Sequence, residues 1–444
     1  MKICVLNGSP RGDLSVTVHT SKYLEKRFPK HEFSYMNIGT RIKVFEKDMT
    51  EALAAMQAAD LLVFSYPVYT FLAPSQLHRF IRKMKECGAD FSGKFVTQIT
   101  TSKHFYDVTA HRYVEDNCHD LGMKVIHGLS ADMEDLTQPQ GQKDADAFFE
   151  YVCWCVEHDV YEPAPAALPG APEEDITLSA VPKTKDRDIV IVADLKQGDA
   201  RLAAMIDAFR AACPWETRMV NLAEYPFSGG CLGCFRCAGD GKCIHKDGFD
   251  TYLRETIQTG DAIVYAFSVC DHSMGPLFKT YDDRQFCNGH RTVTEGMPFG
   301  YIVSGDYEQE PNLRTVIEAR AEVGHNFLAG VGYNQKTMAD MVQRLQYALE
   351  NKYLQPRNFY GVGGMKIFRD LIWMMRGLMK ADHEFYKARG VYDFPQKQRG
   401  KMLMMCLLGG MMRNPKLSAK MGSKFSEGMA APYKKVLAQT TAKE

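Results

Sequence analysis

The stretch Lys2-Ile-Cys-Val-Leu-Asn7-Gly-Ser-Pro-Arg11-Gly12 decides how the first half of this chain folds. The segment from Lys2 to Asn7 is mostly apolar, as a buried strand requires, and it ends at a loop with glycine and proline. Apolar residues at helical spacing follow at Val18, Leu24 and Phe28. This order predicts an anion-binding site, because free backbone N–H groups and the helix dipole converge at the loop. The loop lacks the Gly-Lys-Ser/Thr of nucleoside triphosphatases, so we do not expect that activity.

Strand and helix patterns alternate through the rest of the first half. Further strands are predicted at residues 33–38, 60–66, 94–101 and 123–130, and helices at 49–58, 74–87, 109–121 and 143–156. Strands that alternate with helices predict an α/β fold with a doubly wound parallel sheet. Ligands bind such sheets at the carboxyl ends of the strands. The loops expected there are residues 9–17, 67–74 and 100–106.

Two motifs at the expected separation carry a family resemblance. NGSPRGDLSVT (residues 7–17) and SYPVYTFLAPSQLHRFI (residues 65–81) resemble the flavodoxin-like NAD(P)H-dependent FMN reductases. The resemblance covers about 150 residues and implies a flavodoxin-like FMN-binding domain at residues 1–158, with the strand order 2-1-3-4-5. In that family the first loop binds the FMN phosphate, and the loops after strands three and four flank the flavin ring. NAD(P)H stacks directly on the flavin in this family, so it is a possible electron donor.

The resemblance assigns roles to individual residues. It implies phosphate contacts from Ser9, Arg11, Ser15 and Thr17, a ring border at Pro67, Val68, Tyr69 and Thr70, and a second ring edge at Thr101, Ser102 and His104. His104 is also the one acid–base candidate in these loops, so we expect it to be catalytic. Two simpler interpretations stay open: Tyr69 could be ordinary packing, and Ser15 could cap the following helix.

The second half of the chain repeats the first. Residues 159–187 hold five prolines and predict a linker. The alternation restarts at residues 188–193 (DIVIVA). Ile3 maps to Ile189 with a shift of 186, whereas Asp60 maps to Asp261 with a shift of 201, an excess of 15 residues. We therefore predict a second flavodoxin-like domain at residues 188–350, with an insertion between its first and third strands.

The two copies differ where a flavin would bind. Asn7 to Arg11 corresponds to Ala193-Asp194-Leu-Lys-Gln197, which has lost the serine and the arginine. Asp194 and the nearby Asp199 would repel a phosphate. We therefore expect FMN in the first domain only.

The insertion contains Cys231, Cys234, Cys237 and Cys243, with the spacing C-x2-C-x2-C-x5-C. Such compact runs hold cubane iron–sulfur clusters. A structural zinc ion more often binds two CxxC pairs separated by a long spacer, and thiols without metal are a third interpretation. With these cysteines the second half resembles the iron–sulfur flavoproteins. It differs from them in that flavin and cluster motifs lie in separate halves of this chain.

The carboxy-terminal residues 351–444 are basic and rich in methionine. They contain 18 Lys and Arg against 6 Asp and Glu, and 11 of the 24 methionines. A helix is predicted at residues 367–380, with an apolar face formed by Phe368, Leu371, Ile372, Met375, Leu378 and Met379. One interpretation is a helical extension over the body, walling the flavin cleft, which Asp382 and His383 could reach. The other is a cationic surface that meets a membrane or a partner protein.

Composition limits the remaining function classes. The formal net charge is zero, and no basic surface interleaved with aromatic residues predicts nucleic-acid binding. No apolar run approaches the ~18 residues that span a bilayer. The first residues do not resemble a secretory signal, and thirteen cysteines suit a reducing compartment, so we expect a cytoplasmic protein.

These observations predict a flavin-dependent oxidoreductase. FMN in the first domain would exchange electrons with a [4Fe–4S] cluster in the second, and its partners would be small-molecule or protein electron donors and acceptors. One alternative is a cluster-free NAD(P)H-dependent FMN or quinone reductase, in which the cysteines are structural or redox-sensing. Another is an electron carrier without its own substrate, which docks through the basic residues 351–444. Two chains could also associate.

Overall fold

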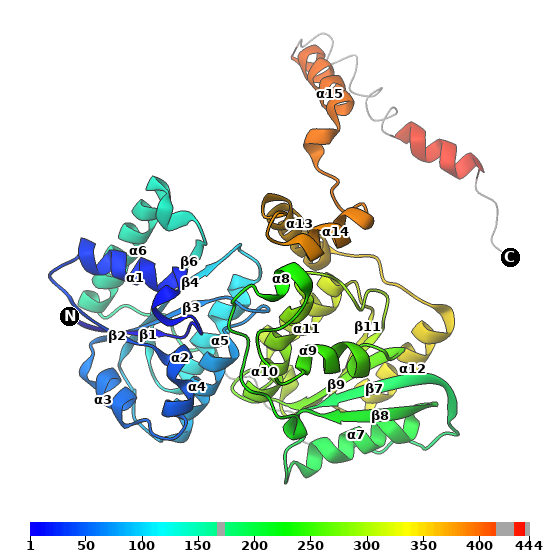
Figure 1. The fold of residues 1–444 in the computed structure, drawn as a ribbon, viewed down its shortest axis with the longest axis horizontal. Coiled ribbons are helices and arrows are strands. Elements are labelled where there is room, and N and C mark those ends of the chain that lie inside the picture. The colour runs from blue at the N-terminus through cyan, green and yellow to red at the C-terminus, as the bar shows by residue number, and fades with distance from the viewer. Residues whose placement is uncertain (167–173, 414–429, 440–444) are drawn as a thin grey trace. The chain divides into compact units, whose positions relative to one another are not determined.

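The first sheet is built around the strand that opens the chain. The structure, a computed structural model, describes residues 1–166, 174–413 and 430–439. Its first five parallel strands run in the order β2-β1-β3-β4-β5, as predicted, and β6 also pairs with β4 (Figure 1). Their bounds are β1 Lys2–Asn7, β2 Glu32–Met36, β3 Leu61–Pro67, β4 Phe95–Ser102, β5 Lys124–Val125 and β6 Leu129–Asp132.

Helices cover both faces of this sheet. Ile3 and Val5 face one core with residues of α6, whereas Cys4 and Leu6 face another core with residues of α2, α3, α4 and α5, because successive strand residues point to opposite faces. The helices are α1 Val16–Arg27, α2 Ile38–Phe45, α3 Thr50–Ala58, α4 Ser75–Glu86, α5 Asp107–Asp120 and α6 Pro139–His158. Residues 2–158 are called the first domain below.

Two elements of the first domain differ from the prediction. The strand predicted at 33–38 ends at Met36, and an unpredicted helix, α2, follows at once. Its second residue is Gly39, where a Cβ would lie 2.2 Å from the Ser9 carbonyl oxygen. Glycine has a low helix propensity, so the helix forms here because of its packing against the Ser9 loop and not because of its local sequence. The strand predicted at 123–130 is two short strands, β5 and β6. They are separated around Gly128, where a Cβ would lie 2.6 Å from the Gln98 carbonyl oxygen.

The second sheet confirms the internal repeat. Its strand order, β11-β10-β9-β7-β8, is the same topology as in the first sheet. Ile3 pairs with Leu61, and its counterpart Ile189 pairs with Ala262, as the shifts predict. The elements are β7 Thr184–Ala193, α7 Ala200–Ala212, β8 Trp215–Asn221, α8 Cys237–Asp240, α9 Phe249–Tyr252, β9 Ala262–Ser268, α10 Pro276–Arg284, β10 Phe299–Ser304, α11 Pro311–Gly324, β11 Leu328–Gly332 and α12 Gln335–Asn351. Residues 184–351 are called the second domain.

The predicted linker is shorter than expected. Strand β7 begins at Thr184, four residues before the predicted start at 188, with a register shift before Ile189. Ile176 and Leu178 pack against the core of the second domain. Residues 167–173 of the predicted linker lie outside the described residues.

The two domains contact each other through the same turn in each copy. Tyr69 and Leu72 close one two-residue turn, and Cys270 and Ser273 close its counterpart. The central residues have positive φ in both turns: 43° and 72° at Thr70 and Phe71, and 53° and 59° at Asp271 and His272. Without glycine this conformation costs energy, so surrounding contacts must hold it.

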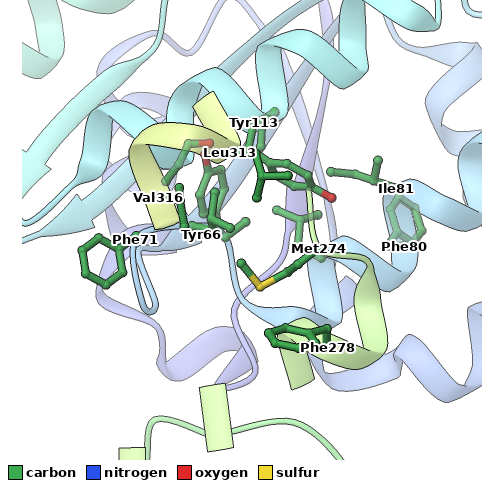
Figure 2. Packing of buried hydrophobic residues seen from close by; sticks show 14 of the residues in the cluster. Tyr66, Phe71, Phe80, Ile81, Tyr113, Met274, Phe278, Leu313 and Val316 are labelled. Atoms are coloured by element: carbon green, nitrogen blue, oxygen red, sulfur yellow. Dashed lines mark hydrogen bonds between the residues drawn. The ribbon is translucent and has the colours of Figure 1, made fainter. Parts of the chain in front are cut away.

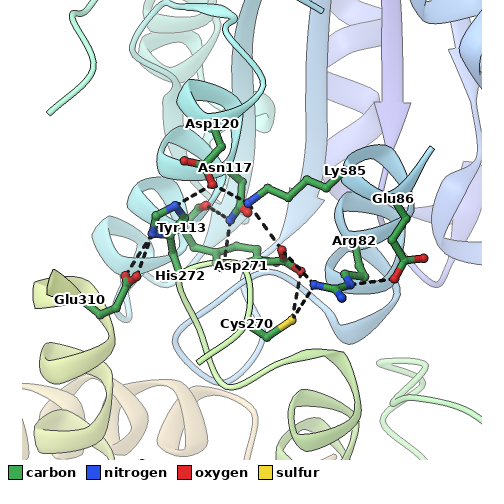
Figure 3. Close-up of polar contacts among 10 residues, drawn as sticks. All are labelled: Arg82, Lys85, Glu86, Tyr113, Asn117, Asp120, Cys270, Asp271, His272 and Glu310. Atoms are coloured by element: carbon green, nitrogen blue, oxygen red, sulfur yellow. Dashed lines mark hydrogen bonds and ion pairs between the residues drawn. The ribbon is translucent and has the colours of Figure 1, made fainter. Parts of the chain in front are cut away.

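Each turn is held by the other domain. The Lys279 ammonium donates to the Tyr69 carbonyl at 2.9 Å, and the Asn117 amide donates to the Asp271 carbonyl at 3.1 Å. Figure 3 shows the second of these contacts, together with His272, which bridges Asp120 of the first domain at 2.9 Å and Glu310 of the second at 3.1 Å. Helix α4 also packs on its counterpart α10, and α5 on its counterpart α11, as equivalent helices do in a symmetric dimer, but here within one chain.

Apolar residues of both domains share one core at this contact. Figure 2 shows Tyr66, Phe80 and Tyr113 of the first domain beside Met274 and Phe278 of the second, all in one cluster of buried residues.

A buried ion pair ties the first turn to the second domain. The side chains of Lys279 and Asp283 are fully buried and bonded to each other. The Asp283 carboxylate also accepts the Ser75 backbone N–H at 2.7 Å and the Thr70 hydroxyl at 2.8 Å. Buried charges are tolerated only when they are paired and hydrogen-bonded, as these are.

Breaking this pair should destabilise the chain strongly. We expect Lys279→Met to lower the free energy of unfolding by about 3–5 kcal/mol, because it leaves the Asp283 carboxylate buried without its counter-ion. Urea unfolding of the full chain measures this.

The matched control is Lys336→Met. Lys336 pairs with Asp340 at the same i,i+4 spacing, but its side chain is 82% exposed. The Lys336→Met substitution should lower the free energy of unfolding by less than about 1 kcal/mol. Equal losses in the two variants would contradict the role given to Lys279.

The helix predicted at 367–380 is wrong in its bounds. Helix α13 (Phe359–Met374) ends before Gly377, and α14 (Lys380–Ala388) begins after it. Ile372 and Met379 are buried, but Leu378 is 56% exposed, so the predicted apolar face is not continuous. Helix α13 packs on α11 of the second domain.

The chain divides into two compact units, Met1–Phe385 and Tyr386–Glu444. In the second unit, α15 (Arg399–Met412) exposes apolar side chains, among them Met402, Leu403 and Leu407. Among the described residues, no helix is both long and apolar enough to cross a membrane. The contact of residues 351–444 with a membrane or a partner protein stays a prediction, and residues 414–429 and 440–444 of this segment lie outside the described residues. Association of two chains also stays a prediction.

Candidate functional site

One cavity of about 360 Å³ lies between the two domains. Its volume is within the range of small-molecule and cofactor sites. Loops of the first domain that were predicted to bind FMN line it, and so do the cysteine loop and the segment after α10 in the second domain. Helices α13 and α14 and the turn between them add a further wall through Phe368, Leu371, Met379 and Asp382.

The predicted phosphate loop lies at the start of α1. Ser9, Arg11, Ser15 and Thr17 all line the cavity. Ser15 occupies the N-cap position, but its hydroxyl makes no capping hydrogen bond, so the structure does not support the simpler capping role. The first turn of α1 holds no acidic residue. The N-terminal end of α1, with its helix dipole, and the exposed Arg11 side chain together suit a phosphate.

Local hydrogen bonds hold this loop in place. The Asn7 side-chain oxygen accepts the Ser9 N–H at 3.2 Å, and the Ser9 hydroxyl accepts the Arg11 N–H at 3.2 Å. The Thr17 and Thr101 hydroxyls lie 2.5 Å apart and join α1 to the end of β4. The phosphate loop is thus fixed relative to the loops that would flank the ring.

The predicted ring border is the turn held by the second domain. Pro67, Val68, Tyr69 and Thr70 line the cavity. Thr70 is bonded to both Lys279 and Asp283, at 2.6 and 2.8 Å. Burial raises the pKa of Tyr69, so its hydroxyl stays protonated at neutral pH.

The other predicted ring edge is only partly at the cavity. Thr101 and Ser102 line it, but His104 is not among its lining residues. The His104 side chain is 53% exposed, and its Nδ1 lies 2.8 Å from the Asp107 carboxylate. The catalytic role of His104 stays a prediction, and its side chain is engaged away from the cavity wall.

In the second domain, acidic side chains occupy the loop that corresponds to the predicted phosphate loop of the first domain. Asp199 caps α7 by accepting the Leu202 N–H at 3.2 Å, and it also accepts the Ser268 hydroxyl at 2.6 Å. Asp194 is buried at the position that corresponds to Gly8, and burial raises the pKa of its carboxyl group. These side chains support the expectation that FMN binds the first domain alone.

All four cysteines of the insertion line the same cavity. None forms a disulfide. The Gly233 N–H points to the Cys231 sulfur at 3.4 Å. The loop is anchored at both ends: buried Arg284 donates to the Gly229 carbonyl at 2.9 Å, and Arg254 donates to the Gly241 carbonyl at 2.6 Å.

The cysteine loop rests directly on the predicted ring border. A Cβ on Gly233 would lie 1.7 Å from the Tyr69 hydroxyl oxygen, so only glycine fits there. The Gln76 amide donates to the Cys231 carbonyl at 3.2 Å. The two motifs lie in separate domains, and the fold brings them into contact.

Four cysteine thiols in one loop at the cavity are suitable ligands for an iron–sulfur cluster, but their sulfur atoms do not converge on one point. Within the described ranges, no group of three or more Cys, His, Asp or Glu side chains is arranged to hold a metal ion. A cluster would therefore have to draw the four sulfurs together. Burial raises the pKa of Cys231 and raises that of Cys237 to about 11, so metal binding would release protons from these thiols.

Several wall residues were missed by sequence analysis. Phe286, His290 and Arg291 line the cavity, and no motif marks them; Phe105 also lines it and lies in the predicted loop 100–106, but no role was given to it. Of the pair Asp382 and His383, the lining includes Asp382 only; its carboxylate is fully buried and lies 3.1 Å from Arg291. The sequence signal for these residues is weak because they come from connecting loops and from a segment outside both repeats.

Comparison with known proteins supports the first-domain assignment. Residues 1–133 match the family model of NADPH-dependent FMN reductases. An iron–sulfur flavoprotein from Archaeoglobus fulgidus is 27% identical over 173 residues, which is 36% of this chain and 78% of that protein. The first domain is accordingly that of a flavin-dependent oxidoreductase.

Solved structures with this fold have low overall similarity. An NADH:FMN oxidoreductase is 16% identical, with a TM-score of 0.30, over 36% of this chain and 91% of its own. An FMN-dependent NADH-azoreductase from Bacillus anthracis is 15% identical, with a TM-score of 0.27, over 34% of this chain and 98% of its own. The assignment rests on the sequence match and on the cavity.

The metal-free thiols should differ in reactivity. Thiolate is the nucleophile, so a raised pKa slows alkylation at neutral pH. We expect iodoacetamide at pH 7.5 to label exposed Cys234 before Cys231 and Cys237. The Cys237 rate should rise about tenfold per pH unit up to a pH of about 11. Peptide mass spectrometry of the metal-free chain measures these rates, and fastest labelling at Cys231 would contradict this picture.

Proposed function

We propose that this chain is a cytoplasmic oxidoreductase in which FMN of the first domain exchanges electrons with a [4Fe–4S] cluster held by Cys231, Cys234, Cys237 and Cys243. NAD(P)H is the proposed donor. One observation carries the proposal: the phosphate loop, the ring border and all four cysteines line a single cavity. Single-electron exchange needs the two centres close together, and the contact of Tyr69 with Gly233 supports that.

The chain's own residues would hold and tune the two groups. When bound, FMN supplies hydride and single-electron chemistry, and a cubane cluster supplies single-electron chemistry. Arg11 and the α1 N-terminus would bind the phosphate, and Val68 and Tyr69 would border the ring. The Gly233 N–H would hydrogen-bond to a cluster sulfur ligand, which is one of the contacts that set reduction potentials.

A cluster-free NAD(P)H-dependent FMN or quinone reductase is the second candidate. It is favoured by the absence, in the part of the chain that the structure describes, of a ready-made group of metal-ligating side chains. Against redox-sensing cysteines stand the raised pKa values of Cys231 and Cys237, since sensor thiols are usually acidic. A pure electron carrier is disfavoured by the match of residues 1–133 to a reductase family.

Iron and flavin content separate the two candidates. The chain purified without oxygen should contain about four irons and one FMN. Its absorption spectrum should show a broad shoulder at about 400 nm beside the flavin bands. Cys231→Ser should lose iron and keep FMN. The control is Cys213→Ser, a buried cysteine of the second domain that lies outside the cavity lining. Flavin without iron in the unaltered chain would leave the cluster-free reductase.

Arg11→Ala tests the phosphate site. We expect FMN affinity to fall about tenfold, because a hydrogen bond to a charged group is worth about 1.5–3 kcal/mol. Riboflavin lacks the phosphate, so its affinity should not change. Flavin fluorescence titration measures both. Arg27→Ala, at the exposed far end of α1, is the control. A parallel loss of riboflavin binding would place Arg11 elsewhere than at the phosphate.

A further inference from the structure

Six aromatic rings surround part of the cavity. All six line it, and they come from three parts of the chain: Tyr69, Phe71 and Phe105 from the first domain, Phe286 and His290 from the second, and Phe368 from α13. We call this set the aromatic belt. Phe71 is buried, and the other five side chains are partly exposed.

The rings of the belt follow one another in a closed circuit. Phe71 and Phe105 have ring centroids 5.0 Å apart, and Phe105 and Phe368 have centroids 4.1 Å apart. The circuit continues from Phe368 to His290 at 4.4 Å, from His290 to Phe286 at 6.1 Å and from Phe286 to Tyr69 at 5.9 Å. It closes because Tyr69 and Phe71 belong to the same turn.

Phe368 is held firmly in this circuit. On the preceding turn of α13, a Cβ on Gly364 would lie 2.7 Å from the Phe105 ring, so glycine permits the close approach of the helix. Beyond α13, the buried Asp382 carboxylate accepts the His290 backbone N–H at 3.3 Å and bonds to Arg291 at 3.1 Å. The segment that carries Phe368 is therefore fixed to the first domain on one side and to the second on the other.

The charges beside the belt are neutralised within the protein. Arg291 pairs with Asp382, and Lys103 pairs with Asp132 at 2.8 Å. Ring faces with balanced charges suit a flat, aromatic and largely apolar molecule, because offset stacking and edge contacts stabilise it on every side.

We propose that Phe368 of α13, through its place in the aromatic belt, is the specificity-determining residue for the planar aromatic acceptor of such a reductase. This inference rests on the proposed flavin function, and it gives the segment outside both repeats a part in the site. For a quinone acceptor the balance is complete: NAD(P)H supplies a hydride and water supplies a proton, so the quinone gains two electrons and two protons and leaves as hydroquinone.

Binding of duroquinone, a planar quinone without charge, tests the proposal. Calorimetric titration of the full chain without NAD(P)H reports binding apart from turnover. Phe368→Ala should weaken binding about tenfold, in line with the loss of one stacking side chain. Phe368→Leu keeps most of the packing volume but lacks the ring, so it should weaken binding nearly as much while unfolding like the unaltered chain.

The matched control is Phe359→Ala. Phe359 is the first residue of α13, is 84% exposed and does not line the cavity, so its loss should leave binding unchanged. The proposal would be overturned if the unaltered chain showed no measurable binding, or if the affinity of Phe368→Leu were within twofold of that of the unaltered chain. Failure of the flavin function would appear differently, as absent FMN and absent NAD(P)H oxidation in the unaltered chain.

Discussion

The ion pair between Lys279 and Asp283 is the constraint on which the site depends. Both side chains are fully buried, and both reach across to the turn that borders the predicted flavin ring. That turn carries two non-glycine residues with positive φ, a conformation that an isolated loop would not keep. The second domain therefore stabilises the shape of the first domain's binding loop, and neither domain has the complete site by itself.

The pairing of the domains also explains how the two copies could diverge. Each keeps the same turn and uses it to contact its neighbour, so the interface limits change at Thr70 and Asp271. The ligand loops are under no such constraint. In the second copy Asp194 and Asp199 occupy the former phosphate loop, while the insertion carries its cysteines to the first copy's cavity. One contact surface is retained, and the two potential sites have become one composite site.

Sequence patterns predicted the fold well because it is set by short-range periodicity. The strand from Lys2 to Asn7, its loop and α1 appear where expected, and the repeat shifts gave the second sheet its register. Helix α2 could not be predicted, because Gly39 is selected by the Ser9 carbonyl, a contact distant in sequence. The composite nature of the site was also hidden: Lys279 and Asp283 look like ordinary charges on a helix, and nothing local shows that they are buried. Phe368 was predicted on an apolar face, but its ring neighbours, Phe105 and His290, come from two separate segments, one in each domain.

The covalent link between the two domains has a consequence for how the site responds to dilution. In a dimer of separate subunits, a composite site disappears when the protein concentration falls below the dissociation constant. Here the linker keeps the second domain at a high effective concentration near the first, whatever the amount of protein. The site should therefore persist in a single molecule, and its assembly should follow first-order kinetics during refolding.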